Sequence, residues 1–120
     1  MLRQALKSTS PAQRRWAFWL CAAAVLALCL MPPVRHLPST GWDKANHALA
    51  FAMLALLGLA AYPAPRARVL WGLIAYGALI EVLQSLTGYR TAEWLDLAAD
   101  AVGVVAGVQL ARWWAPTGSA

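Results

Sequence analysis

Four long apolar stretches that carry almost no charge dominate the sequence. They cover approximately residues 16–31, 43–62, 68–87 and 92–114. Each is close to the ~20 residues that a helix needs to cross a bilayer, and in lipid such a segment must pair its own backbone groups as a helix. The composition, 61% hydrophobic and 12% charged, is too apolar for a soluble globule. The sequence therefore predicts an all-α polytopic membrane protein, a bundle of four transmembrane helices.

The polar ends of the chain are expected to lie outside this bundle. We divide the sequence into a basic head (1–15), the four-helix domain (16–114) and a tail (115–120). A basic head before an apolar run is also typical of a signal peptide. The first run is long, however, and no small-residue cleavage pattern precedes Pro32 and Pro33. We therefore expect a retained first span, with a signal peptide as the alternative.

The distribution of positive charge predicts an orientation. An even number of spans places both termini on one side, and that side collects seven of the ten basic residues, namely Arg3, Lys7, Arg14, Arg15, Arg66, Arg68 and Arg112. Because cytoplasmic loops carry the excess of Lys and Arg, we expect a bacterial inner-membrane protein with both termini in the cytoplasm. The 32–42 and 88–93 loops then lie outside. The basic residues form no continuous patch, so no nucleic-acid partner is expected.

The acidic residues gather in the opposite, outer half of the predicted bundle. They are Asp43, Glu81, Glu93, Asp96 and Asp100. At 1.5 Å of rise per residue, His47, Glu81 and Asp100 lie about 7, 9 and 10 Å below the outer ends of their spans. Three helices thus carry ionisable groups at one shallow depth. A charge there costs about 2–3 kcal/mol on insertion scales, so each group should face the interior and have a partner.

Helical spacing places these groups in two stripes, each along one face of its own helix. The first stripe is Gly77, Glu81, Gln84 and Gly88, and the second is Asp96, Asp100, Gly103 and Gly107. Asp43 and His47 likewise share a face, with Asp43 at the position of a helix N-cap. The pair Gly103-x-x-x-Gly107 should let a neighbouring helix approach closely, which is a packing role.

We expect the catalytic candidates His47, Glu81 and Asp96 to meet in a pocket near the outer surface. In an enzyme, His47 would act as general base and Glu81 as general acid, while Arg90 over the mouth would pair with phosphate or carboxylate. The ligand-binding candidates are Asp43, Lys44, Gln84, Arg90 and Asp100.

Three alternatives stay open for this group. The group can bind a ligand without catalysing a reaction. It can also form a buried polar network that only fixes helix packing in a structural subunit. A metal site built from His47, Asp43, Glu81 and Asp96 has no diagnostic spacing, so the prediction is no metal and no cofactor.

The order of these motifs resembles the VanZ-like family of small bacterial membrane proteins. The resemblance rests on Asp43-Lys44-x-x-His47, Glu81-x-x-Gln84, Arg90 and Asp96-x-x-x-Asp100-x-x-Gly103. The family usually has Asn where this chain has Asp100, which adds a buried acid. The resemblance implies an envelope protein, linked in the founding member to resistance to the lipoglycopeptide teicoplanin. The expected partner is a membrane lipid or a lipid-linked envelope molecule, and the sequence leaves catalysis and oligomeric state open.

Overall fold

The computed structural model describes residues 4, 7–31, 43–62, 65–88 and 93–114. Its long helices are α2 (Pro11–Leu30), α3 (Asp43–Ala61), α4 (Arg66–Leu86) and α5 (Trp94–Trp114). By length and composition these four helices could all cross a membrane, and the described residues include no strand. The predicted all-α fold with four helices of this kind is confirmed.

Helix α2 begins at Pro11, earlier than the start predicted at Trp16. The Ser10 side chain accepts from the Gln13 backbone N–H at 3.1 Å, and the Gln13 side chain accepts from the Ser10 N–H at 2.8 Å. This reciprocal capping box, with proline at the first helical position, defines the start of the helix. Hydropathy placed the start too late because the first turn is polar, whereas Ser10-x-x-Gln13 is itself a helix-start signature.

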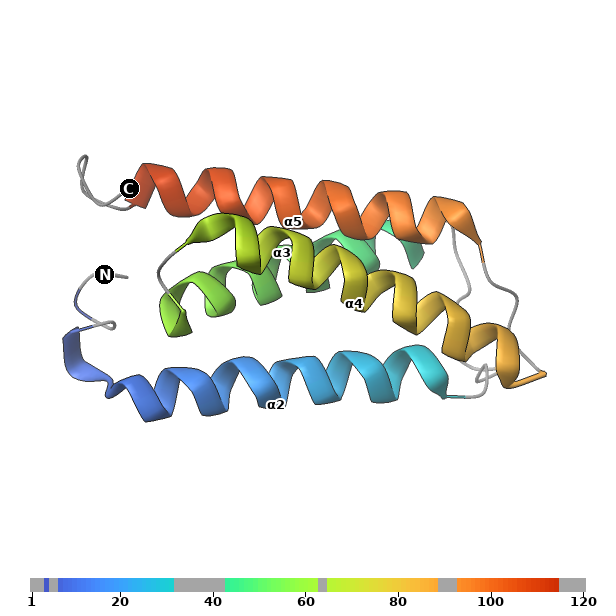
Figure 1. Ribbon diagram of the computed structural model, residues 1–120, viewed down its shortest axis with the longest axis horizontal. Coiled ribbons are helices and arrows are strands. Elements are labelled where there is room, and N and C mark those ends of the chain that lie inside the picture. Colours follow the sequence, from blue (N-terminus) through green and yellow to red (C-terminus); the bar gives the residue numbers. More distant parts are fainter. Residues whose placement is uncertain (1–3, 5–6, 32–42, 63–64, 89–92, 115–120) are drawn as a thin grey trace.

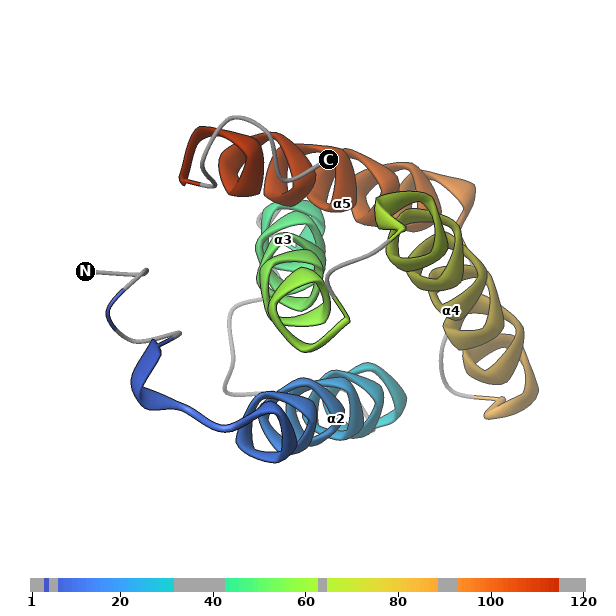
Figure 2. The same cartoon turned by 60° about the vertical axis from the view of Figure 1, so that its left-hand side comes forward.

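The helices form an antiparallel bundle in which α3 is central (Figures 1 and 2). Helix α3 packs most extensively on α5, and α2 packs against α3. The start of α2 and the end of α5 lie at the same end of the bundle (Figure 1). We call this the basic end, after Arg14, Arg15, Arg66, Arg68 and Arg112 on the adjoining turns. The opposite end is the acidic end, with Lys44, His47, Glu81, Glu93, Asp96 and Asp100.

The contact between α3 and α5 depends on the two glycines of the predicted packing motif. A Cβ at Gly103 would collide with the Ala48 carbonyl oxygen, and a Cβ at Gly107 would lie 2.6 Å from the Ala52 carbonyl oxygen. No residue with a side chain fits at these positions without moving a helix. The prediction that Gly103-x-x-x-Gly107 admits a close neighbour is confirmed, and van der Waals packing of this kind is what holds helices together in lipid.

Apolar side chains cover both the interior and the outside of the bundle. Phe51, Leu54, Ile80 and Val104 are fully buried. Large apolar residues also face outward, including Trp16 and Trp71, which are 68% and 65% exposed. A helix that is apolar all round is typical of a membrane span, because the outer face then contacts hydrocarbon.

Candidate functional site

The candidate site is a buried cluster at the acidic end, made by His47 on α3, Glu81 on α4 and Asp100 on α5. His47 Nδ1 and Asp100 Oδ1 are 2.9 Å apart, and the Asp100 side chain is fully buried. The close contact at Gly103 positions this pair, since Ala48 follows His47 and Gly103 lies one turn from Asp100. The glycine that joins the two helices therefore also brings the histidine and the carboxylate together.

Helix α4 makes room for the Asp100 carboxylate through a third glycine. A Cβ at Gly77 would lie 2.9 Å from Asp100 Oδ2. The carboxylate is therefore enclosed between His47 on one side and the α4 backbone on the other. Gly77 is on the stripe predicted to face the interior, and here it creates the space that an additional buried acid requires.

Two carboxylate oxygens of the cluster lack a hydrogen-bond partner within the described part of the chain. Glu81 is 7% exposed, and its Oε2 accepts from the Glu93 backbone N–H at 3.0 Å. Its Oε1 is buried and unpartnered, and so is Asp100 Oδ2. A buried polar atom without a partner costs about 1–3 kcal/mol, and native proteins normally satisfy such atoms. These two oxygens therefore point to a donor, a proton or a cation supplied from outside this set of residues.

A second layer of charge lies outside the buried cluster. Lys44 Nζ is 3.0 Å from Glu93 Oε2 and 3.4 Å from Asp96 Oδ1. The Lys44 and Glu93 side chains are about half exposed, while Asp96 is mostly buried. We call these three residues the rim. Because the rim lies nearer the helix ends, a ligand approaching from the acidic end meets it before the buried cluster.

The structure brings His47 and Glu81 together, as the sequence predicts, but the third member of the cluster is Asp100. Asp96, the acid that the sequence placed with them, pairs with Lys44 in the rim. The two acids lie on one face of α5, separated by about 6 Å of helix rise. Helical rise already places Asp100, and not Asp96, at the depth of His47 and Glu81, and the packing at Gly103 fixes the level of α5 against α3 that brings Asp100 to His47.

The other predicted ligand-binding residues have different places. Gln84 Nε2 donates to the Cys29 carbonyl oxygen at 2.8 Å and so connects α4 to α2, while its buried Oε1 has no partner among the described residues. Asp43 is the first residue of α3. Arg90, the Asp43 side chain and the greater part of the predicted outer loops are outside the described residues.

Glu93 is a participant that the sequence analysis did not select. It contributes its backbone N–H to Glu81 and its carboxylate to Lys44. Its place directly before α5 is the only signal that could have identified it, since the residue before a helix often has a free N–H. The contact to Glu81 spans two helices, so no local motif encodes it.

The cluster has the residue types of a metal site. His47, Glu81 and Asp100 each offer a ligand atom, and these atoms lie within 4.8 Å of one another. Atoms bound to one Zn²⁺ at about 2.1 Å can be at most about 4.2 Å apart, so a metal would need the side chains to close slightly. The metal set considered from the sequence contained Asp43 and Asp96 in place of Asp100.

Fold and cluster together define a multi-pass α-helical membrane protein with ionisable groups buried between its helices. The family model of VanZ/LLP1 matches residues 6–115. The chain therefore belongs to the VanZ/LLP1 family, and the resemblance drawn from Asp43-Lys44-x-x-His47 and the later motifs is confirmed. Neither the comparison with curated proteins nor the comparison with solved structures gives a match.

Proposed function

We propose that the acidic end of this VanZ-type protein binds a lipid-linked or lipid-bearing molecule of the cell envelope. The observation that carries the proposal is the pair of buried, unpartnered oxygens, Glu81 Oε1 and Asp100 Oδ2. Hydroxyl, amide or amine groups of a sugar or peptide headgroup are the donors that such oxygens lack. The lipid part of the same molecule would stay in the surrounding bilayer, so the ligand need not leave the membrane.

The proposed orientation makes the acidic end face outward from the bacterial inner membrane. It rests on the seven-to-three division of basic residues, with the larger group at the basic end. Single cysteines at Ser39 and Thr117, with Cys21 and Cys29 replaced, would be labelled by a membrane-impermeant reagent in intact cells. We expect the residue 39 variant to react and the residue 117 variant to be protected, and the reverse pattern contradicts this orientation.

A second candidate function is processing of the bound molecule, and the His47–Asp100 contact favours it. A carboxylate that bonds one imidazole nitrogen fixes the ring and makes the other nitrogen a better base. Glu81 lies beside them as a carboxyl group that can return the proton. Binding and acid–base chemistry therefore need the same residues, and a contribution to resistance against teicoplanin-type antibiotics is proposed only from the family resemblance.

The alternative is a structural subunit whose polar network only fixes helix packing. Such a network stabilises a bundle when each member is satisfied, because an unpaired buried group is costly. The two unpartnered oxygens of Glu81 and Asp100 fit this alternative poorly. Among the described residues, they are acceptors with which the donor groups of a ligand could pair.

The test measures protein level and phenotype in the same cells for His47→Ala and Glu81→Gln. A functional cluster predicts a loss of resistance or of envelope integrity that exceeds any fall in membrane accumulation. Ser85→Ala is the matched control, because Ser85 is exposed one turn from Glu81 on α4. Normal phenotype in both well-expressed variants contradicts the proposal, and a parallel fall in abundance and phenotype favours the structural subunit. Mass spectrometry of co-purified lipid would then identify the headgroup.

A further inference from the structure

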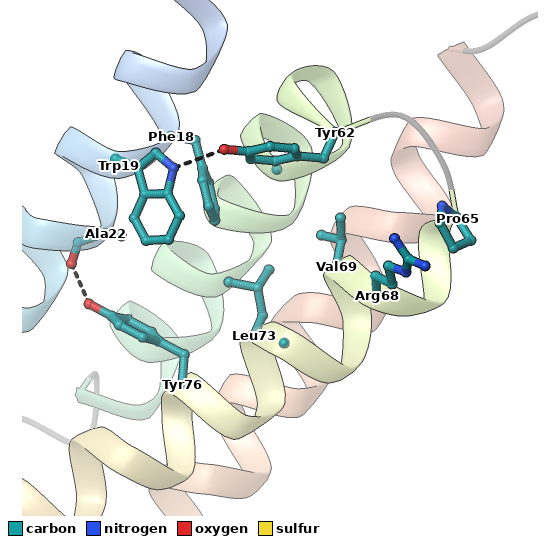
Figure 3. A pocket seen from close by; sticks show the side chains of 11 residues that line it. Phe18, Trp19, Ala22, Tyr62, Pro65, Arg68, Val69, Leu73 and Tyr76 are labelled. Carbon is teal, nitrogen blue, oxygen red and sulfur yellow. Dashed lines mark hydrogen bonds between the residues drawn. The ribbon is translucent and has the colours of Figure 1, made fainter.

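An apolar recess lies in the half of the bundle toward the basic end, between α2, α3 and α4, and none of the three cluster residues lines it (Figure 3). Its volume is about 360 Å³, and its walls include Phe18, Trp19, Tyr62, Leu73 and Tyr76. Helices α2 and α4 make few contacts with each other, so the recess lies where the bundle is least tightly closed.

The polar atoms in the aromatic wall are already paired within the protein. Trp19 Nε1 donates to the Tyr62 hydroxyl at 3.1 Å, and the Tyr76 hydroxyl donates to the Ala22 carbonyl oxygen at 2.6 Å. Figure 3 shows these two bonds joining α2 to α3 and to α4 across the recess. The interior therefore offers hydrocarbon and ring faces, and it suits an apolar occupant.

Two arginines stand at the outer limit of the recess. Arg68 is one of its lining residues, and the Arg15 guanidinium lies over the Tyr62 ring, 5.5 Å from its centre. All acidic side chains that the structure describes belong to the acidic end, so no described carboxylate neutralises these cations. An apolar interior beneath an arginine pair is complementary to an anionic amphiphile.

The length of the recess matches one leaflet. On α4 it extends from Arg68 to Tyr76, which is about 12 Å of helix rise. Half of a typical hydrocarbon core is about 15 Å. Arg68 is also within the first turn of α4, and basic residues at the end of a span are expected near the headgroups.

We propose that this recess holds one acyl chain of an anionic phospholipid from the leaflet at the basic end, with the lipid phosphate paired to Arg68 and Arg15. Lipid surrounds every face of such a bundle, but the recess adds a concave apolar wall that includes Arg68 and has Arg15 over its Tyr62 ring. This site is independent of the proposed function of the buried cluster.

Gly72 provides a direct way to fill the recess. It belongs to the lining, and a Cβ there would meet nothing within 4 Å. Gly72→Leu should therefore place its side chain in the recess with no backbone contact at its Cβ, and leucine is the better helix former. Ala75→Leu is the matched control, because Ala75 is an exposed α4 residue that does not line the recess.

The test is native mass spectrometry of the purified chain in detergent with added phosphatidylglycerol, or with phosphatidylcholine of the same acyl chains. We expect phosphatidylglycerol to bind about tenfold more tightly than phosphatidylcholine, because the choline cation of the latter repels the arginines. Arg68→Gln should weaken phosphatidylglycerol binding about tenfold, as for one lost charge-assisted hydrogen bond. Gly72→Leu should weaken binding of both lipids. Arg112→Gln, an exposed cation at the same end outside the recess, and Ala75→Leu should bind as the unaltered chain does.

Several results would overturn the proposal. Binding of both lipids that no variant changes means that the lipid is annular only. Unaltered phosphatidylglycerol binding in Arg68→Gln, or equal losses in Arg68→Gln and Arg112→Gln, removes the phosphate assignment. Because Arg68 and Arg112 are both exposed, the comparison of Arg68→Gln with Arg112→Gln tests the proposal even if Gly72→Leu does not fold. If inorganic phosphate competes for the site as strongly as the phospholipid does, the acyl-chain part of the proposal is wrong.

Discussion

The two ends of the bundle differ in where their charged side chains lie. At the acidic end, His47, Glu81 and Asp100 turn inward from three helices and meet in the interior. At the basic end, the charged side chains stand at the outside of an apolar recess. A buried charge is expensive and an exposed one at a helix end is not, and this difference underlies the two proposals. The polar ligand is proposed for the inward arrangement, and the amphiphile, whose apolar part enters and whose charge stays out, for the outward one.

The largest expected effect is a difference in stability between substitutions at two glycines, Gly103 beside the buried cluster and Gly72 in the apolar recess. Gly103→Leu forces a side chain onto the Ala48 backbone, and overpacking that a backbone cannot relieve should cost about 3 kcal/mol or more. Gly72→Leu, with open space at its Cβ, should leave stability close to that of the unaltered chain. Thermal unfolding in detergent measures both. If Gly103→Leu unfolds at the unaltered temperature, the close contact between α3 and α5 is wrong.

The features of the acidic end that sequence could predict are those that depend on one helix at a time. Four apolar runs define the spans, and constant helical rise puts His47, Glu81 and Asp100 at similar depths. Gly103-x-x-x-Gly107 likewise requires only a count along α5. Each of these inferences uses spacing within a segment, which the sequence states directly.

The remaining features depend on how helices meet, and spacing within one helix does not contain that information. Helical rise gives Asp100 the depth of His47, but the packing of α5 on α3 decides that the two side chains are in contact. The backbone N–H of Glu93 reaches Glu81 across two helices. The apolar recess is made of ordinary aromatic and aliphatic residues on three helices, and no motif distinguishes them from residues that face lipid.

A second comparison concerns the cost of breaking the buried pair. His47→Ala leaves the Asp100 carboxylate fully buried without its nearest partner, and we expect a loss of about 1–3 kcal/mol. Adding Asp100→Leu should recover part of that loss, because the unpaired acid is then gone. Asp100→Asn alone keeps a hydrogen-bonding group beside His47 and should change stability little. A double-mutant cycle on unfolding free energies measures the coupling, and strictly additive losses would mean that the two residues do not interact.

A smaller effect is expected from the hydrogen bonds that border the apolar recess. Tyr76→Phe removes the donor to the Ala22 carbonyl oxygen, and such a bond contributes about 0.5–1.5 kcal/mol. Trp19→Phe removes the exposed bond to Tyr62 and should cost less, since water or headgroups can replace it. Unfolding temperatures of the two variants test this order. A greater loss in Trp19→Phe would show that the outer bond, rather than the deeper one, holds α2 in place.

The smallest effect on stability should come from the rim, although Lys44 and Glu93 form a close ion pair there. Lys44 is 3.0 Å from Glu93, but both side chains are about half exposed, and exposed ion pairs contribute little because water and salt screen them. Lys44→Gln should therefore shift the unfolding temperature far less than His47→Ala does, and the shift should shrink further as salt is raised. Arg112→Gln, an exposed cation at the other end, supplies the baseline for losing a surface charge. A Lys44→Gln shift as large as that of His47→Ala, unchanged by salt, would mean that the rim belongs to the buried cluster and that the acidic end is more tightly closed than its exposed lysine indicates.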